Sequence, residues 1–130
     1  MPHHKMQQYV NVDYNSEMSV VALVGDPGEG TIIAEARYAK DEDSAYGDVA
    51  FIVEEKYQGL GIATYLYEML IRLAKERGLK GFTAEVLQTN KAMMKVFEKG
   101  HLPITARLKD GLYRLKIPFD TQADQPENNN

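Results

Sequence analysis

The segment best suited to chemistry is a glycine-bearing stretch between an apolar run and a helical pattern. It reads Gln58-Gly59-Leu60-Gly61-Ile62-Ala63. Glycine lets the backbone approach a ligand closely and adopt conformations that are closed to other residues. At the start of a helix, outward-pointing amides and the helix dipole favour an anion. The stretch therefore predicts a phosphate or pyrophosphate site, and the alternative is a plain turn from strand to helix.

Two common nucleotide-binding patterns do not fit this stretch. A P-loop ends in Gly-Lys followed by Ser or Thr, and no such run follows Gly61. A dinucleotide-binding fingerprint needs a small residue three positions after its second glycine, and Thr64 stands there.

The elements that must position the stretch are read from changes in periodicity. Strands are expected at residues 19–24, 31–38, 46–54, 82–87, 103–108 and 112–117. Helices are expected from residue 62 to Arg77-Gly78 and over residues 90–99. Residues 46–54 are apolar on both faces, which predicts a central strand, and Asp110-Gly111 predicts a hairpin. The order βββαβαββ predicts an α+β fold.

Composition narrows the class of protein. The 130 residues suit one domain, and 15 basic against 19 acidic side chains give a net charge of −4. Without a basic block, nucleic acid is not an expected partner, and no apolar run approaches the length of a membrane span. The chain has no cysteine, which excludes disulfides, thiolate metal sites and cysteine nucleophiles and suits the reducing cytoplasm. We expect a cytoplasmic protein without a metal or membrane contact.

The stretch at residues 58–63 resembles the Q/R-x-x-G-x-G/A motif of the GNAT acyltransferases, with Tyr57 before it. Asn90, three residues after the next expected strand, is similar to the asparagine that opens the following helix in that family. The resemblance covers residues 18–119 and includes the order of elements. It implies a mixed, largely antiparallel sheet with a central β-α-β unit and with helices packed on the sheet.

The N-terminus departs from that family, which normally begins with a strand and two helices. Only 17 residues precede Met18, so the first strand and the helix pair are expected to be missing. Residues 1–17 are interpreted as an N-terminal segment, with residues 6–10 as at most the remnant of the second helix. Residues 13–18 resemble the segment before this domain in bacterial protein-lysine acetyltransferases. By the same resemblance, residues 18–119 are expected to form the acyltransferase domain, and residues 120–130 are expected to be a disordered tail.

The resemblance implies acetyl-CoA as cosubstrate. By similarity, the exposed backbone of Ile52 and Val53 would pair with the pantetheine arm, and Asn90 would bond near the thioester. The amides expected around the pyrophosphate belong to Gln58, Gly59, Leu60, Gly61, Ile62 and Ala63.

The catalytic residue that the resemblance implies is a general base on the strand at residues 46–54, and its closest match is Asp48. A lysine ammonium has a pKa near 10.4, so direct transfer needs a base to remove a proton. A carboxylate buried in this apolar strand would be a stronger base. The alternative is an exposed aspartate that caps the preceding charged loop. Phe97 stands where many members carry a tyrosine as general acid, so that role is unfilled or goes to water.

These residues predict an N-acetyltransferase that moves an acetyl group from acetyl-CoA to an amine, a protein lysine being one candidate. Without cysteine, the amine would attack the thioester directly in a ternary complex. The alternatives are a non-catalytic acyl-CoA-binding module and a dimerising remnant of the fold. An open edge near residues 18–24, or exchange of the hairpin at 103–117, predicts a homodimer. The competing outcome is a monomer in which residues 2–14 fold back over the domain.

Overall fold

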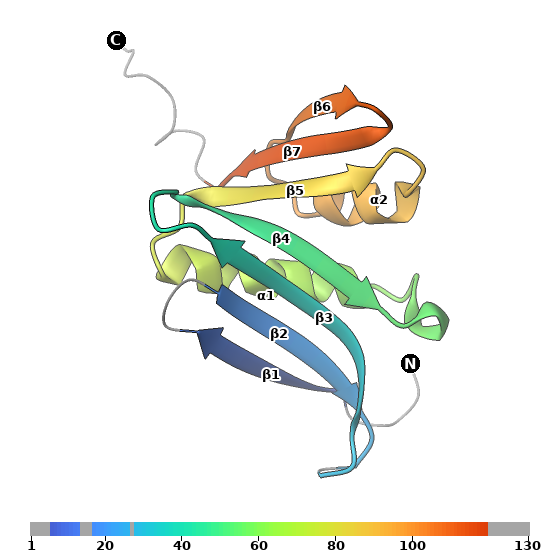
Figure 1. Ribbon diagram of the computed structural model, residues 1–130. Coiled ribbons are helices and arrows are strands. Elements are labelled where there is room, and N and C mark those ends of the chain that lie inside the picture. The colour runs from blue at the N-terminus through green and yellow to red at the C-terminus, as the bar shows by residue number, and fades with distance from the viewer. Residues whose placement is uncertain (1–5, 14–16, 27, 120–130) are drawn as a thin grey trace.

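The computed structural model describes residues 6–13, 17–26 and 28–119, which form a seven-stranded mixed sheet with two α-helices on it (Figure 1). The strand order is β1-β2-β3-β4-β5-β7-β6. The strands are β1 (Met6–Asp13), β2 (Glu17–Val24), β3 (Thr31–Lys40), β4 (Tyr46–Val53), β5 (Gly81–Leu87), β6 (Thr105–Lys109) and β7 (Leu112–Pro118). The helices are the short 3-10 helix η1 (Glu55–Tyr57), α1 (Ile62–Glu76) and α2 (Lys91–Lys99). Among the described strands, the only parallel pair is β4 with β5, on either side of α1, and this confirms the expected α+β fold with a central β-α-β unit.

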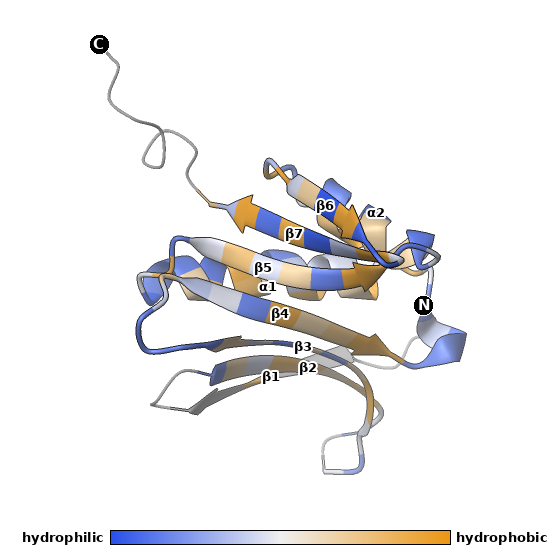
Figure 2. Ribbon diagram, turned by 45° about the horizontal axis from the view of Figure 1, so that its top comes forward, coloured by the Kyte–Doolittle hydropathy of each residue, from blue (hydrophilic) through white to orange (hydrophobic). Residues whose placement is uncertain are grey.

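Both α-helices lie on the same face of the sheet, behind it in Figures 1 and 2. The expected stripe of α1 is buried there, including Ile62, Leu66 and Leu70. Alternate residues of the strands, such as Val20 and Phe82, point into the same layer and are fully buried. The core is therefore a single layer between the sheet and its helices, and the other face of the sheet stays open.

One expectation about β4 is wrong. The strand is central, as its apolar sequence predicted, but only one of its faces is covered. Val49 is 4% exposed on the helix side, whereas Ile52 is 66% exposed on the open face. Both helices pack on one side, so half of this apolar strand faces solvent.

The N-terminal expectation is wrong in one part, because a strand precedes residue 18 where a missing strand and a helix remnant were expected. β1 pairs antiparallel with β2 along its whole length, with Val10 opposite Val20. Val10 and Val12 alternate with polar residues, a period of two that suits a strand rather than the expected helix remnant at residues 6–10. Only residues 14–16 separate the two strands, which is too short for a helix pair.

The closing hairpin agrees with its sequence signal. Asp110 and Gly111 connect β6 and β7 with φ angles of 54° and 77°, the left-handed pair that Asp-Gly supplies in a two-residue turn. The expected disordered tail at residues 120–130 lies outside the described residues, as do residues 2–5 and 14–16. Within the described part of the chain, no helix has the length and apolarity to cross a membrane.

The homodimer prediction changes with the topology, because β1 covers the edge of β2 at residues 18–24. Residues 6–13 pair with β2, so this part of the N-terminal segment folds back onto the domain, as the monomeric alternative expected. The free edges of the described sheet are now β1 and β6, and a dimer would pair through one of them. We expect sedimentation at micromolar concentration to give a species at twice 14.7 kDa. A single clean species near 14.7 kDa would contradict the dimer.

Candidate functional site

The site begins where the two parallel strands separate. β4 and β5 pair only from Tyr46 opposite Gly81 to Asp48 opposite Thr83. Beyond that point β5 continues beside β7, while β4 has no strand partner on this side among the residues that the structure describes. A wedge therefore opens between the two strands, and one edge of it is β4 backbone that pairs with no neighbouring strand of the described sheet.

Strand register decides which backbone groups face this wedge. The N–H of Glu54 donates to the carbonyl of Ile33 on β3 at 2.8 Å. Hydrogen-bonded and non-bonded pairs alternate in an antiparallel ladder, so Ile52 also turns its backbone to β3, opposite Glu35. The N–H and C=O of Phe51 and Val53 then face the wedge. The backbone of Val53 thus faces the wedge as expected, together with that of Phe51. The backbone of Ile52 faces β3 instead, although Ile52 still lines the cavity described next.

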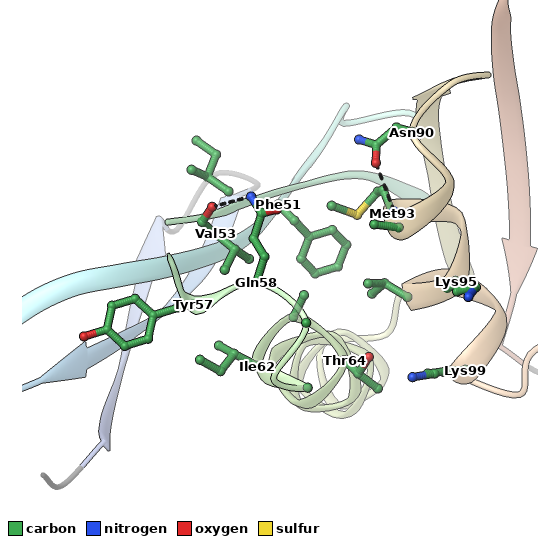
Figure 3. Close-up of a pocket in the computed structure, with 16 residues that line it drawn as sticks. Phe51, Val53, Tyr57, Gln58, Ile62, Thr64, Asn90, Met93, Lys95 and Lys99 are labelled. Carbon is green, nitrogen blue, oxygen red and sulfur yellow. Dashed lines mark hydrogen bonds between the residues drawn. The ribbon is translucent and has the colours of Figure 1, made fainter. Parts of the chain in front are cut away.

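A cavity of about 440 Å³ lies on the helix side of this wedge (Figure 3). Its walls are the end of β4, the loop after η1, the first turn of α1 and one side of α2. Every residue expected to bind the cofactor lines the cavity except Leu60, whose side chain is 52% exposed. Lining residues that the sequence reasoning missed include Phe51, Thr64, Lys95 and Lys99. Lys95 and Lys99 are four residues apart on α2, a helical spacing that could have identified them.

The glycine loop leaves free donors at the start of α1, although the N–H of Gln58, which was expected among them, already donates to the carbonyl of Glu55 at 3.2 Å. Gly59 and Gly61 have φ angles of 78° and 84°, and Gly61 is the N-cap residue of α1. No side chain caps the helix, and its first turn contains no acidic residue. The first-turn amides of an α-helix have no partner within the helix and carry the positive end of its dipole. The local chemistry of the loop therefore favours an anion, as its sequence predicted.

Two polar side chains fix the shape of the cavity (Figure 3). The Nε2 of Gln58 donates to the carbonyl of Val53 at 3.1 Å and ties the loop to the end of β4. The Oδ1 of Asn90 accepts from the N–H of Met93 at 3.1 Å and caps α2. The cap uses the amide oxygen of Asn90, so the Nδ2 group is the part of this side chain that can donate to a ligand.

Asp48 occupies the last paired position before the wedge. Its carboxylate is exposed on the open face and accepts a hydrogen bond from the Oγ1 of Thr83 at 2.9 Å. The idea that burial strengthens this base is wrong, because the side chain faces solvent. Asp48 does not line the cavity. Cavity and carboxylate lie on opposite sides of the sheet, both next to the point where β4 and β5 separate, which we call the fork.

Buried aromatic side chains pack behind Phe51, one of the residues that line the cavity. Phe97 is 1% exposed, and its ring meets those of Phe51 and Tyr67 edge to face at 5.6 and 5.2 Å between centroids. Burial raises the pKa of the Tyr67 phenol well above its usual range. Phe97 has no proton to donate, and the raised pKa makes the Tyr67 phenol a weaker acid than an exposed tyrosine. Among the described residues, no group of three or more His, Asp or Glu side chains could hold a metal ion.

Comparisons with known proteins agree on one family. Residues 2–101 match the model of the acetyltransferase (GNAT) family. The chain is 35% identical to Acetyltransferase Pat of Mycolicibacterium smegmatis over 97% of its own length, which is 38% of that protein. The GNAT domain of S. lividans PAT superposes with a TM-score of 0.71 at 31% identity, covering 84% of this chain and 64% of that one. A cAMP-binding acyltransferase from Mycobacterium smegmatis gives a TM-score of 0.71 at 29% identity, over 90% of this chain and 36% of that one.

Proposed function

The chain belongs to the acetyltransferase (GNAT) family, and on that premise we propose that it transfers the acetyl group of acetyl-CoA to a lysine amine by direct attack in a ternary complex. The observation that carries the proposal is the cavity that joins the free amides of the glycine loop to the unpaired edge of β4. Acetyl-CoA is an anionic head on an extended amide-bearing arm. The anionic head suits the amides of the glycine loop, and the extended arm suits the edge of β4.

Binding of acetyl-CoA follows from this match. The pyrophosphate would accept from the amides of the loop and the first turn of α1, where the dipole favours negative charge. The pantetheine arm would lie in the wedge as an added strand, its amides paired with the backbone of Phe51 and Val53. The Nδ2 group of Asn90 would donate to the arm near its thioester end.

The chemistry is proposed to occur at the fork. Asp48 takes a proton from the ammonium, and the freed amine attacks the thioester carbonyl carbon. The N–H of Phe51 faces the wedge and would polarise the carbonyl oxygen. The C–S bond then breaks and coenzyme A leaves as thiolate. The attacking nitrogen gives its second proton to that thiolate or to water, which completes the neutral amide product. A thiol is acidic enough to leave without a side-chain acid, which suits a chain with Phe97 at the usual tyrosine position.

The buried Phe97 also supports a second candidate, a module that binds acyl-CoA without turnover. One assay separates the two functions. Acetyl-CoA would be mixed with a lysine-containing peptide, and released thiol and acetylated peptide would be measured together. We expect both products in equal amounts. Binding of acetyl-CoA by calorimetry without either product would favour the binding module.

Two lysines on α2 are expected to add to cofactor affinity. Lys95 and Lys99 line the cavity and are exposed. They can therefore form ion pairs with the 3′-phosphate of coenzyme A, while the loop binds the pyrophosphate. A Lys95→Ala, Lys99→Ala double variant should raise the Kd for acetyl-CoA about tenfold in calorimetry, since each charged pair contributes modestly at a wet surface. The same variant should bind coenzyme A and dephospho-coenzyme A equally.

The matched control for these lysines is a Lys75→Ala, Lys80→Ala double variant, which removes two exposed cations outside the cavity. It should leave the Kd unchanged. Equal losses in both double variants would assign the effect to net charge rather than to the cavity.

A further inference from the structure

On the open face of the sheet, the charged side chains are mostly basic on one side of the wedge and mostly acidic on the other. Alternation places four basic side chains on this face over β6 and β7, and we call them the basic strip: Arg107, Lys109, Arg114 and Lys116. Glu85 on β5 is the carboxylate beside them, and its ion pair with Arg114 is 3.4 Å long. The other half of the face, over β2 to β4, carries Glu17, Glu35 and Asp48 with one cation, Arg37. Figure 2 shows this face toward the viewer, with the helices behind it.

The basic strip contains a contact that costs stability. Arg107 and Arg114 are directly opposite one another in the β6–β7 ladder, and like charges in that position are destabilising. Glu85 neutralises Arg114 only in part, because both side chains are more than half exposed. Arg107 has no ion-pair partner among the described residues. A face that keeps two such arginines, in a chain of net charge −4, is suited to bind an anion.

The strip is aligned with the fork where transfer is proposed. One row of the sheet runs from Asp48 through Thr83 and Lys116 to Thr105. With strands about 4.8 Å apart, β7 lies about 10 Å and β6 about 14 Å from Asp48. An extended peptide advances about 3.3 Å per residue, so a side chain three to five residues from an amine at Asp48 reaches the strip.

We propose that the basic strip selects the acceptor, which is a protein segment with carboxylates about three to five residues from its target lysine. This inference rests on the proposed acetyl transfer at Asp48. The lysine cation would meet the acidic half of the face, and its acidic flank would meet Arg107 and Arg114. Nucleic acid fits less well, because a continuous polyanion lying on the strip would also meet the carboxylates of Asp48 and Glu35.

The test compares labelled peptides that differ only in flanking charge. Each peptide has one lysine and a run of three identical residues, either three glutamates or three glutamines. The run lies about three to five positions from the lysine, before it in one set of peptides and after it in the other. Fluorescence anisotropy measures binding to the chain at low and high salt. In at least one of the two placements, we expect the Glu peptide to bind about tenfold more tightly than its Gln counterpart at low salt. The difference in affinity should shrink at high salt, because salt screens the charges.

Variants assign this difference to the strip. The double variant Arg107→Gln, Arg114→Gln should bind Glu and Gln peptides equally. The control Arg72→Gln removes an exposed cation from α1, on the other side of the sheet, and should keep the preference. Because Arg107 opposes Arg114, Arg107→Gln should also melt no earlier than the parent, which a structural role for Arg107 would not allow.

Three outcomes overturn the proposal: equal binding of Glu and Gln peptides by the parent chain, no binding of any peptide, or tighter binding of a single-stranded RNA of matched length than of the Glu peptide. Calorimetry with acetyl-CoA on the same preparation tests the proposed function separately. A parent chain that binds no acetyl-CoA would reject acetyl transfer, and peptide binding would still decide whether the strip recognises acidic segments.

Discussion

The variant Gly61→Glu is expected to raise the Kd for acetyl-CoA at least about 100-fold, which corresponds to about 2.7 kcal/mol. Gly61 lines the cavity as the N-cap residue of α1, and its φ angle is 84°. A Cβ atom there would meet nothing within 4 Å, so the new side chain has no packing clash and would project from the loop. Its carboxylate would repel the pyrophosphate and occupy the space next to the amides. Isothermal calorimetry measures the effect.

Gly78 offers a matched control at the other end of the same helix. Its φ angle is 87°, and a Cβ atom there would also meet nothing within 4 Å. Gly78→Glu and Gly61→Glu therefore carry a similar backbone cost of about 1–2 kcal/mol, which thermal unfolding measures. Only Gly61→Glu should lose acetyl-CoA. Equal Kd values for Gly61→Glu and the parent chain would show that the loop does not hold the cofactor.

The variant Asp48→Asn is expected to lower kcat by at least about 100-fold, the lower range for loss of a general base. The amide keeps the size of the side chain and can still accept from Thr83, but it cannot take a proton from the ammonium. Asp48 lies outside the cavity, so the Kd for acetyl-CoA should stay near the parent value. Steady-state assays with a lysine peptide and calorimetry with acetyl-CoA give the two readings.

Two further variants separate proton transfer from surface charge. Glu35→Gln removes a carboxylate one strand away on the same face and should change kcat little. Asp48→Glu keeps the carboxylate, lengthens it by one methylene and should retain most of the turnover. Near-parental turnover by Asp48→Asn would return Asp48 to a structural role, in which its bond to Thr83 fastens β4 to β5 at the fork.

Features encoded within a few neighbouring residues could be predicted from the sequence. The glycine loop and the Asp110-Gly111 turn both have the positive φ angles that glycine and aspartate allow. The stripe of α1 was visible because residues on one face of a helix recur every three to four positions. The anion site and half of the cavity-lining residues followed, since all of those predicted except Asn90 lie between Ile52 and Ala63.

Features that depend on distant partners could not be predicted. The alternation in β1 extends over only a few residues, and its pairing with β2 establishes it as a strand. The backbone that faces the wedge belongs to Phe51 and Val53 rather than to Ile52, and this follows from the register of β4 against β3. A shift of register by one residue reverses both the side-chain face and the backbone direction, and no pattern within β4 itself fixes that register.

The sequence by itself determined the family motif, the helix that it opens and the anion-binding loop, because local backbone preference and periodicity act over only a few residues. The tertiary structure decided that both helices cover one face, which left Asp48 exposed on the other. It also decided that Asp48 stands in one row with Thr83 and Lys116, which are 35 and 68 positions away along the chain. Pairing across such separations is set by the register of every strand between them, and so by the packing of the whole sheet.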